Sequence, residues 1–551
     1  MSHKFKGHGS RFIQRPYGAG AFLVIAVTAA FIFTPVSRVR PESISNINPD
    51  ADAAIPLMVA EMKGNTEWRK GKLRNSIVVT PLRDSGLEPG YEYIATGIHK
   101  EILLRLSMIG GLNLVDFSPA LIPDYTDESL TVQQIAQELK VENIMQGMVR
   151  YENGKLDLNI QLIDGVTGKQ LWSSVYSGDP VLIFSFLADI AIQSASMNQI
   201  EIPRDVRLRV NKQLTTSQDA YMYFLRALTL APELNSAVPM EFYDFLDRAI
   251  TIDPGFAMAH AFKAAGLGMA IANGIQINGM TFEAMEKIAL DHVADVMLQD
   301  PEISMSYLAQ AFIHWNHQRG TPARASFERA LKLSPNDIVI LGGYARFLSI
   351  TGDHVEAERM AMHAAELSTT DSVYHELLGE VYFYAGKLTA AEDSIRTAIS
   401  FSPSRYEPHV LYGLIELVQH NNDKAISELR IAEQLLNNYS PHYEDLAIHI
   451  YACSILGLDQ DAQRLFSQFD TRVDNGEYIS ASALVLAYLA MGHNNVAFDV
   501  LSRSPNEGTS ALKIIKTNIL HDPVLDASRF DELRRRIGMI GGRSNLYIPP
   551  F

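Results

Sequence analysis

Between residues 75 and 200, short apolar runs alternate with segments of helical spacing. The runs that indicate strands are short and end at turn residues, whereas the other segments place apolar residues three or four positions apart. Asn153-Gly154 is a strong hairpin signal between two of the strands. The predicted strands are 75–81, 112–116, 143–151, 156–164 and 170–176, and the predicted helices are 91–108, 131–139 and 181–197. This order, β-α-β-α-β-β-β-α, predicts a compact α+β domain over 75–200.

From residue 217 to about 505 the strand pattern gives way to a repeat of 34 residues. Small residues mark the repeat, and those that recur at this interval are Ala323, Ala357, Ala391 and Ala425, then Ala330, Ala364, Ala398 and Ala432, and also Gly379 and Gly413. This is the period of tetratricopeptide repeats, whose paired helices approach closely at small residues. The pattern predicts an all-α superhelix, with four regular units at 304–337, 338–371, 372–405 and 406–439.

The repeats at both ends of the superhelix are less regular. One unit runs from Pro254 to Pro301, a spacing of 47 residues, and its segment 272–281 predicts a loop inserted between the two helices. Ala462 and Ala497 indicate two further degenerate units. Residues 506–551 are predicted to form capping helices and a tail.

Residues 17–36 are uncharged and predominantly apolar. Twenty residues in a helix span roughly 30 Å, which is the thickness of a bilayer's hydrocarbon core. Four basic residues lie in the tail 1–16 and two follow the span, so the N-terminus is predicted to be cytoplasmic. A cleaved signal peptide is the alternative. The apolar residues continue through Phe33, beyond Thr28-Ala29-Ala30, which favours an uncleaved transmembrane helix followed by a linker over 37–74.

The charge of the chain is distributed unevenly. Residues 1–40 hold six basic and no acidic side chains, whereas the other 511 residues hold 41 basic and 63 acidic side chains, a net charge of −22. A body this acidic repels phosphate backbones, which argues against nucleic-acid binding. The single cysteine, Cys453, can form no internal disulfide and is expected to be a small buried residue.

Residues 75–200 resemble the TolB-N-like domain, which is related to CsgG and FlgO and precedes tetratricopeptide repeats in bacterial membrane proteins. The resemblance is most specific from Ile160 to Asp164, through Thr167-Gly168, to Leu171-Trp172. Shorter matches are at 77–81, 97–101, 106–107, 111–112, 136–141 and 147–150, and near the C-terminus at 522–523 and 531–533. The resemblance covers roughly 460 residues, including the repeats.

The resemblance implies an envelope protein whose relatives often carry a cytoplasmic adenylate-cyclase or winged-helix module before the membrane helix. Only 15 residues precede the uncharged run that begins at Pro16, so such an output module is expected to be missing. The sequence also departs from the family at Thr80, Leu82 and Gln146, where the family usually has Leu, Phe and Glu. These changes preserve a fold and argue against conserved chemistry at those positions.

The motifs of several enzyme classes are absent from the sequence. It contains no P-loop, no nucleophile elbow and no HExxH helix. We therefore predict no enzymatic activity, no cofactor and no metal site.

The repeat register predicts which side chains line the concave face of the superhelix. Positions 2, 5, 9 and 12 of each first helix are expected to point into this groove. The resulting candidates are Leu308, Phe312, Trp315, Val339, Arg346, Ser349, Glu376, Glu380 and Phe383. Aromatic side chains beside Arg346 would suit an extended or helical apolar segment of a partner. The alternative is that Phe312 and Trp315 pack between repeats.

Together these features predict a scaffold that is anchored in the bacterial inner membrane by one span, faces the periplasm and binds another envelope protein or peptide. The alternative function is a sensor subunit that signals through a separate cytoplasmic partner. The sequence is compatible with a homo-oligomer.

Overall fold

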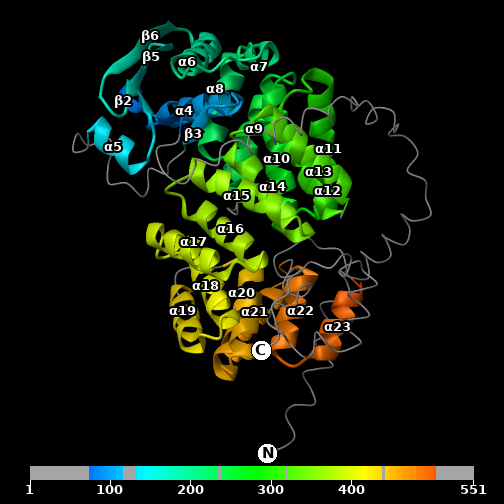
Figure 1. The fold of residues 1–551 in the computed structure, drawn as a ribbon. Coiled ribbons are helices and arrows are strands. Elements are labelled where there is room, and N and C mark those ends of the chain that lie inside the picture. Colours follow the sequence, from blue (N-terminus) through cyan, green and yellow to red (C-terminus); the bar gives the residue numbers. More distant parts are fainter. Residues whose placement is uncertain are drawn as a thin grey trace, which may run out of the picture.

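The computed structural model describes residues 74–115, 131–231, 238–317, 319–436, 441–475, 477 and 479–503. A small α/β domain lies at the top of Figure 1, and a long series of helix pairs continues below it. No helix among these residues is both long and apolar enough to cross a membrane. The predicted span 17–36, nearly all of the linker 37–74 and the predicted capping segment 506–551 lie outside the described residues.

The α/β domain contains a mixed six-stranded sheet with its main path in the order β3-β1-β4-β5-β6. β1 pairs in parallel with β3 and β4, whereas β4, β5 and β6 form antiparallel pairs. β2 is an additional strand that pairs in parallel with β4. The strands are β1 (Ser76–Val79), β2 (Arg83–Leu87), β3 (Asn113–Val115), β4 (Asn143–Glu152), β5 (Lys155–Asp164) and β6 (Gln170–Gly178). The five predicted strands are confirmed, and β2 was not predicted.

The predicted helices of this domain are also present. They are α4 (Tyr93–Ser107), α5 (Val132–Glu138) and α6 (Ile183–Met197), and α7 (Arg204–Val210) follows before the repeats begin. The hairpin between β4 and β5 turns at Asn153 and Gly154, which both have positive φ angles, 53° and 75°. Asn and Gly tolerate this conformation, which explains why that pair of residues connects the two strands.

The 34-residue repeat is observed as consecutive helix pairs. They are α8 (Gln218–Thr229) with α9 (Met240–Ile252), α10 (Ala257–Ala272) with α11 (Phe282–Gln299), α12 (Ser304–Asn316) with α13 (Gly320–Leu333), α14 (Ile338–Thr351) with α15 (His354–Leu367), α16 (Ser372–Tyr384) with α17 (Leu388–Phe401), α18 (Tyr406–Val418) with α19 (Asn422–Leu435), α20 (Tyr443–Ile455) with α21 (Asp459–Asp474), and α22 (Ala481–Ala490) with α23 (Asn494–Arg503).

Small residues lie where the two helices of a pair meet, as the period predicted. A Cβ atom on Gly379 would lie 2.6 Å from the Ile395 side chain, and one on Gly413 would lie 2.7 Å from Leu429. Both distances are shorter than a van der Waals contact, so a larger residue at either position would require the opposite side chain to shift. The recurring alanines are fully buried at the same crossings.

The inserted loop predicted at 272–281 is confirmed as residues 273–281, between α10 and α11. It reaches a distant repeat, since the hydroxyl group of Tyr443 on α20 donates a hydrogen bond to the carbonyl of Gly274 at 3.3 Å. The superhelix therefore has a contact across its turns as well as contacts between neighbouring repeats.

The α/β domain and the repeats are joined by a continuous apolar core. α4 lies so close to α8 that a Cβ on Gly97 would be 2.9 Å from Leu225. Further along the repeats, the Asn336 side chain donates hydrogen bonds to the carbonyls of Ile109 at 2.9 Å and Leu112 at 2.6 Å. The domain is thus fixed both to the first repeat and to the loop before α14.

Candidate functional site on the first helices of the repeats

Four of the predicted groove residues are enclosed by the protein. Leu308, Phe312, Trp315 and Phe383 are 2%, 3%, 8% and 0% exposed. They occupy first helices, and these helices contact one another from pair to pair, so their apolar side chains fill the space between repeats. Their burial corrects the prediction that these four side chains face a partner, and for Phe312 and Trp315 the alternative of packing between repeats describes them.

An aromatic cluster accounts for the burial of Phe312 and Trp315. The Trp315 ring lies 5.8 Å from the ring of Phe347, and the Phe312 ring lies 5.6 Å from that of Phe327. Both pairs are near perpendicular, the edge-to-face arrangement that aromatic rings favour. Ser349 is also buried, whereas Val339 is partly buried. These side chains contribute to stability rather than to recognition.

The three charged candidates lie together. Arg346 on α14 and Glu380 on α16 form an ion pair with 3.3 Å between Nη2 and Oε2. Glu376, one helical turn before Glu380, forms an ion pair of 2.8 Å with Arg405, which directly precedes α18. The register therefore brought Arg346, Glu376 and Glu380 into one site, although it did not identify Arg405.

Three more carboxylates, which the sequence analysis missed, complete this site. Glu407 lies 3.4 Å from Arg405, and Glu444 on α20 accepts a hydrogen bond of 3.1 Å from the Ser480 hydroxyl. Asp445 is close enough to interact electrostatically with Glu407, Glu376, Glu444 and Glu380. We call Glu376, Glu380, Glu407, Glu444 and Asp445 the acidic cluster. Its members come from three different repeats. Glu444 lies 68 residues, or two 34-residue periods, after Glu376, whereas Glu407 and Asp445 share no such spacing with the other members.

The acidic cluster contains more carboxyl groups than guanidinium groups. Among the described residues, its five carboxylates face two guanidinium groups, those of Arg346 and Arg405. Burial, reinforced by Glu407 and Glu380, raises the pKa of Glu376 to about 7, although both arginines oppose this change. Burial and then its glutamate neighbours raise the pKa of Asp445 well above its ordinary value. The folded protein thus holds carboxylates where their ionised forms are disfavoured.

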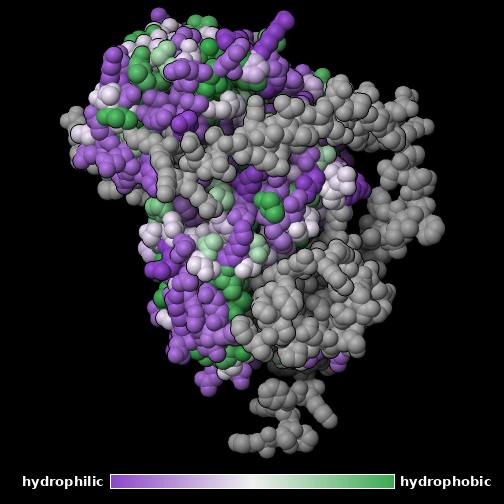
Figure 2. Space-filling view, viewed as in Figure 1, coloured by the Kyte–Doolittle hydropathy of each residue, from purple (hydrophilic) through white to green (hydrophobic). Residues whose placement is uncertain are grey.

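In Figure 2 the described residues on the face in view are predominantly hydrophilic, and the hydrophobic ones form small groups. A partner that supplied positive charge to the acidic cluster would lower the electrostatic cost of its ionised carboxylates.

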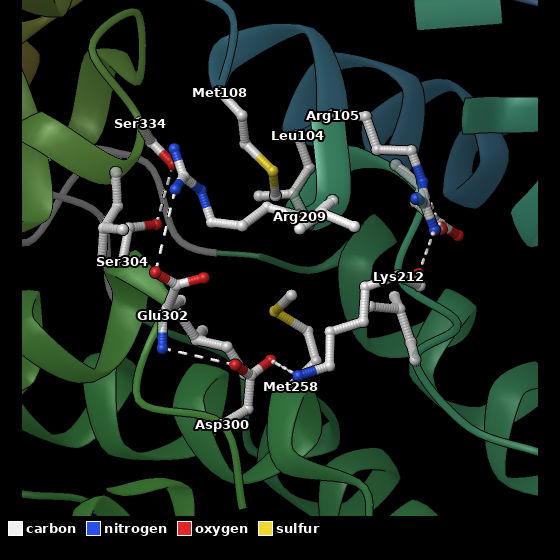
Figure 3. Close-up of a pocket in the computed structure, with 15 residues that line it drawn as sticks. Leu104, Arg105, Met108, Arg209, Lys212, Met258, Asp300, Glu302, Ser304 and Ser334 are labelled. Atoms are coloured by element: carbon white, nitrogen blue, oxygen red, sulfur yellow. Dashed lines mark hydrogen bonds and ion pairs between the residues drawn. The ribbon is translucent and has the colours of Figure 1, made fainter. Parts of the chain in front are cut away.

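A cavity of about 180 Å³, lined by both charged and apolar side chains, lies at the junction of the α/β domain and the repeats. Figure 3 shows the side chains of Arg209 and Lys212 extending along it toward Glu302 and Asp300. The Nζ atom of Lys212 lies 2.7 Å from Asp300, and the nearest guanidinium nitrogen of Arg209 lies 4.0 Å from Glu302. Each cation faces a carboxylate, so the cavity carries little net charge.

Beside this cavity, Glu101 and Arg105 of α4 form a buried network that joins the two parts of the protein. The Arg105 Nη2 atom is 2.9 Å from Glu101. The same guanidinium donates to the carbonyl of Val210, and the hydroxyl of Tyr221 on α8 donates to the other oxygen of Glu101. The charged groups of Glu101 and Arg105 are hydrogen-bonded within this network, so the network holds the α/β domain and the repeats together.

The comparisons with known proteins are limited in extent. No protein-family model matches the chain. A curated relative, "Putative adenylate cyclase 3" of Rhizobium meliloti (strain 1021), is 27% identical over 186 residues, which are 34% of this chain and 31% of the relative. The match thus spans about a third of the relative's length. The TolB-N-like resemblance is supported only to this weak degree.

Several solved structures of helical repeat proteins are similar to the chain. They are pilF of Pseudomonas aeruginosa (14% identity, TM-score 0.31, 39% of this chain and 92% of that one), the Cut9-Hcn1 structure of the APC/C (17%, 0.38, 60% and 68%) and the P58(IPK) TPR domain (12%, 0.20, 64% and 97%). These TM-scores are low. The assignment of tetratricopeptide-type repeats rests instead on the 34-residue period and the helix pairs of this structure.

Proposed function

We propose that this protein is a scaffold whose acidic cluster binds a positively charged segment of a protein partner. One observation carries the proposal. Among the described residues, five carboxyl groups and only two guanidinium groups come together on or next to α14, α16, α18 and α20, which are the first helices of their pairs. Repeat proteins commonly bind partners along the surface formed by such helices. A Lys- or Arg-containing segment matches the charge of the cluster, whereas the apolar segment expected from the register does not.

A binding experiment with matched variants tests this proposal. The test variant carries Glu376→Gln, Glu380→Gln and Glu407→Gln, and the control carries Glu358→Gln, Glu392→Gln and Glu433→Gln. The control residues lie on second helices and form ion pairs with Lys or Arg, so both variants change the net charge equally. The probe is a fluorescent peptide of alternating Lys and Leu, compared with its Glu and Leu counterpart.

We expect the cationic peptide to bind the full-length protein, and we expect this binding to weaken as the salt concentration increases. The test variant should bind the peptide at least about tenfold more weakly, since a tenfold change in affinity requires only about 1.4 kcal/mol. The control variant should bind as the unmodified protein does. An equal loss in both variants would mean that only overall charge matters. If the test variant alone loses affinity, photocrosslinking from position 380 in cells can identify the natural partner. Failure to capture any protein from this position would argue against a partner at the acidic cluster.

We further propose that residues 17–36 anchor the scaffold in the bacterial inner membrane, with the repeats in the periplasm. The support is the uncharged apolar run and the basic residues before it. A reporter enzyme that is active only outside the cytoplasm, fused after Arg40, should be active. Silence of this reporter, with activity of a cytoplasmic reporter at the same position, would reject the topology.

A sensor subunit is the second candidate function. It is favoured by the similarity of part of the chain to a relative whose name describes an adenylate cyclase. Deletion of residues 2–15 separates the candidates, because a sensor that signals to a cytoplasmic partner should lose its output and a periplasmic scaffold should keep its binding.

A further inference from the structure

A group of potential metal ligands lies between α10 and α11, the two helices that flank the inserted loop. Figure 1 shows these helices at the upper right of the series of helix pairs. His260 lies near the start of α10, and His292 and Asp295 are three residues apart on α11, so they share one face of that helix. One ligand atom from each residue lies within 4.8 Å of the other two.

The hydrogen bonds of His260 direct one of its nitrogens toward the other two residues. Its Nε2 atom lies 3.2 Å from the carbonyl of Pro254, which requires this nitrogen to carry the hydrogen. In the neutral ring, Nδ1 then presents a lone pair, and this atom lies 2.8 Å from Nδ1 of His292. A backbone carbonyl that orients the distant nitrogen of a histidine is a common second-shell feature of metal sites.

The distances from the His260 Nδ1 atom to the other two ligand atoms are close to those of a tetrahedral site. With metal–nitrogen bonds of about 2.0–2.1 Å, two ligands of one zinc ion lie roughly 3.3 Å apart. The distance from His260 Nδ1 to Asp295 Oδ2 is 3.4 Å, which already satisfies this geometry. The two histidine nitrogens must separate by about 0.5 Å, and His292 is only partly buried and can rotate that far.

The surroundings also favour a cation. His260 is buried, whereas the side chain of Asp295 is 51% exposed, so the site opens to solvent on one side. Lys263 lies close enough to interact electrostatically with His292, and it forms an ion pair with Asp247. With Asp295 and Asp247 against Lys263, the group carries one net negative charge when the histidines are neutral.

We propose that His260, His292 and Asp295 bind one divalent transition-metal ion of the zinc class, with the fourth coordination position open to solvent. Two imidazole nitrogens and one carboxylate form a ligand set that suits zinc and its first-row neighbours, and not calcium or magnesium, which prefer oxygen. The ion would join α10 to α11 and so fix the base of the inserted loop, which contacts α20 through Gly274 and Tyr443.

Cobalt and zinc titrations of the metal-depleted full-length protein test this site. Cobalt in a four-coordinate site with nitrogen ligands gives visible absorption bands, and zinc should displace it. We expect one equivalent of these bands in the unmodified protein. His292→Ala and Asp295→Asn should each lower the affinity at least about 100-fold, because the loss of a ligand should exceed the 10–100-fold effect of losing a second-shell partner.

The matched control is His317→Ala. His317 pairs with Glu286 on α11 at 2.7 Å and so supplies a histidine and a carboxylate without a third ligand. This variant should keep the full cobalt signal, and zinc should raise its melting temperature as in the unmodified protein. Circular dichroism shows whether each variant is folded. Absence of the bands in the unmodified protein, or their persistence in folded His292→Ala and Asp295→Asn, would overturn the proposal.

Discussion

Glu376 connects the stability of the repeats to pH. Its pKa is raised from 4.5 to about 7 in the folded protein, chiefly by burial. Between these two values the folded state holds more protons than the unfolded state, so the contribution of this residue to stability falls as the pH rises from about 4.5 to 7. We predict that Glu376→Gln increases the free energy of unfolding at pH 8 by on the order of 2 kcal/mol and leaves it unchanged at pH 4.

Urea denaturation of both proteins at both pH values measures this effect. Glu358→Gln is the control, since Glu358 is more exposed and pairs with Lys387, and a change within about 0.5 kcal/mol is expected at either pH. An equal gain for Glu376→Gln at pH 4 and pH 8 would show that the stabilisation does not come from ionisation.

Tyr221 stabilises the joint between the α/β domain and the repeats. Its hydroxyl donates to Glu101, and both residues are fully buried. We predict that Tyr221→Phe lowers the free energy of unfolding by about 1–3 kcal/mol, because a buried carboxylate oxygen loses its donor. Thermal unfolding measures the loss, and Tyr307→Phe is the control, since its hydroxyl donates to Pro301 at an exposed place. If the two variants lose equally, the buried network has no special role.

At the residue scale, the sequence predicted the identity of core positions better than it predicted the candidate site. The repeat register placed Arg346, Glu376 and Glu380 together because one helix face recurs every 34 residues. Glu444 lies two periods after Glu376 and was not selected, although the register reaches it. The register could not place Asp445, because the approach of this residue depends on how the pairs are stacked. It also could not bring His260 to His292, since the inserted loop between them breaks the period.

At the element scale, the turn at Asn153-Gly154 and the small residues of the helix pairs were predictable because their backbone requirements are local. β2 (Arg83–Leu87) was missed because its sequence, RDSGL, is polar and its residues are mostly exposed. Its extended conformation is stabilised by pairing with β4, and the local sequence pattern does not indicate this pairing.

The contact of α4 with α8 depends on Gly97. Because a Cβ there would lie 2.9 Å from the backbone oxygen of Leu225, any larger side chain must separate the two helices. We predict that Gly97→Val destabilises the protein by about 3 kcal/mol or more in urea denaturation. Gly320→Val is the control, since a Cβ on Gly320 meets no atom within 4 Å. A small effect at Gly97 would mean that α4 moves away from the repeats at little cost.

At the scale of the whole molecule, the core does not divide where the sequence pattern changes. The sequence separates an α/β domain ending at residue 200 from repeats beginning at 217. One apolar core runs instead from Ile77 in β1 to Val381 in α16, and a second begins at Phe383. The α/β domain and the first repeats should therefore unfold together, and the later repeats should form a separate cooperative unit.

Tryptophan fluorescence can detect these two units. In a Trp68→Phe and Trp315→Phe background, Trp172 in β6 is the remaining reporter, and it packs against the first core. We predict that Phe327→Ala, which removes a fully buried ring of α13 in that core, lowers the urea midpoint reported by Trp172, since such a truncation costs about 3–5 kcal/mol. Phe469→Ala removes a ring that is equally enclosed in the second core and should leave the Trp172 midpoint unchanged. If Trp172 does not respond to Phe327→Ala, the α/β domain unfolds independently, and the boundary that the sequence placed before residue 217 would be the thermodynamic one.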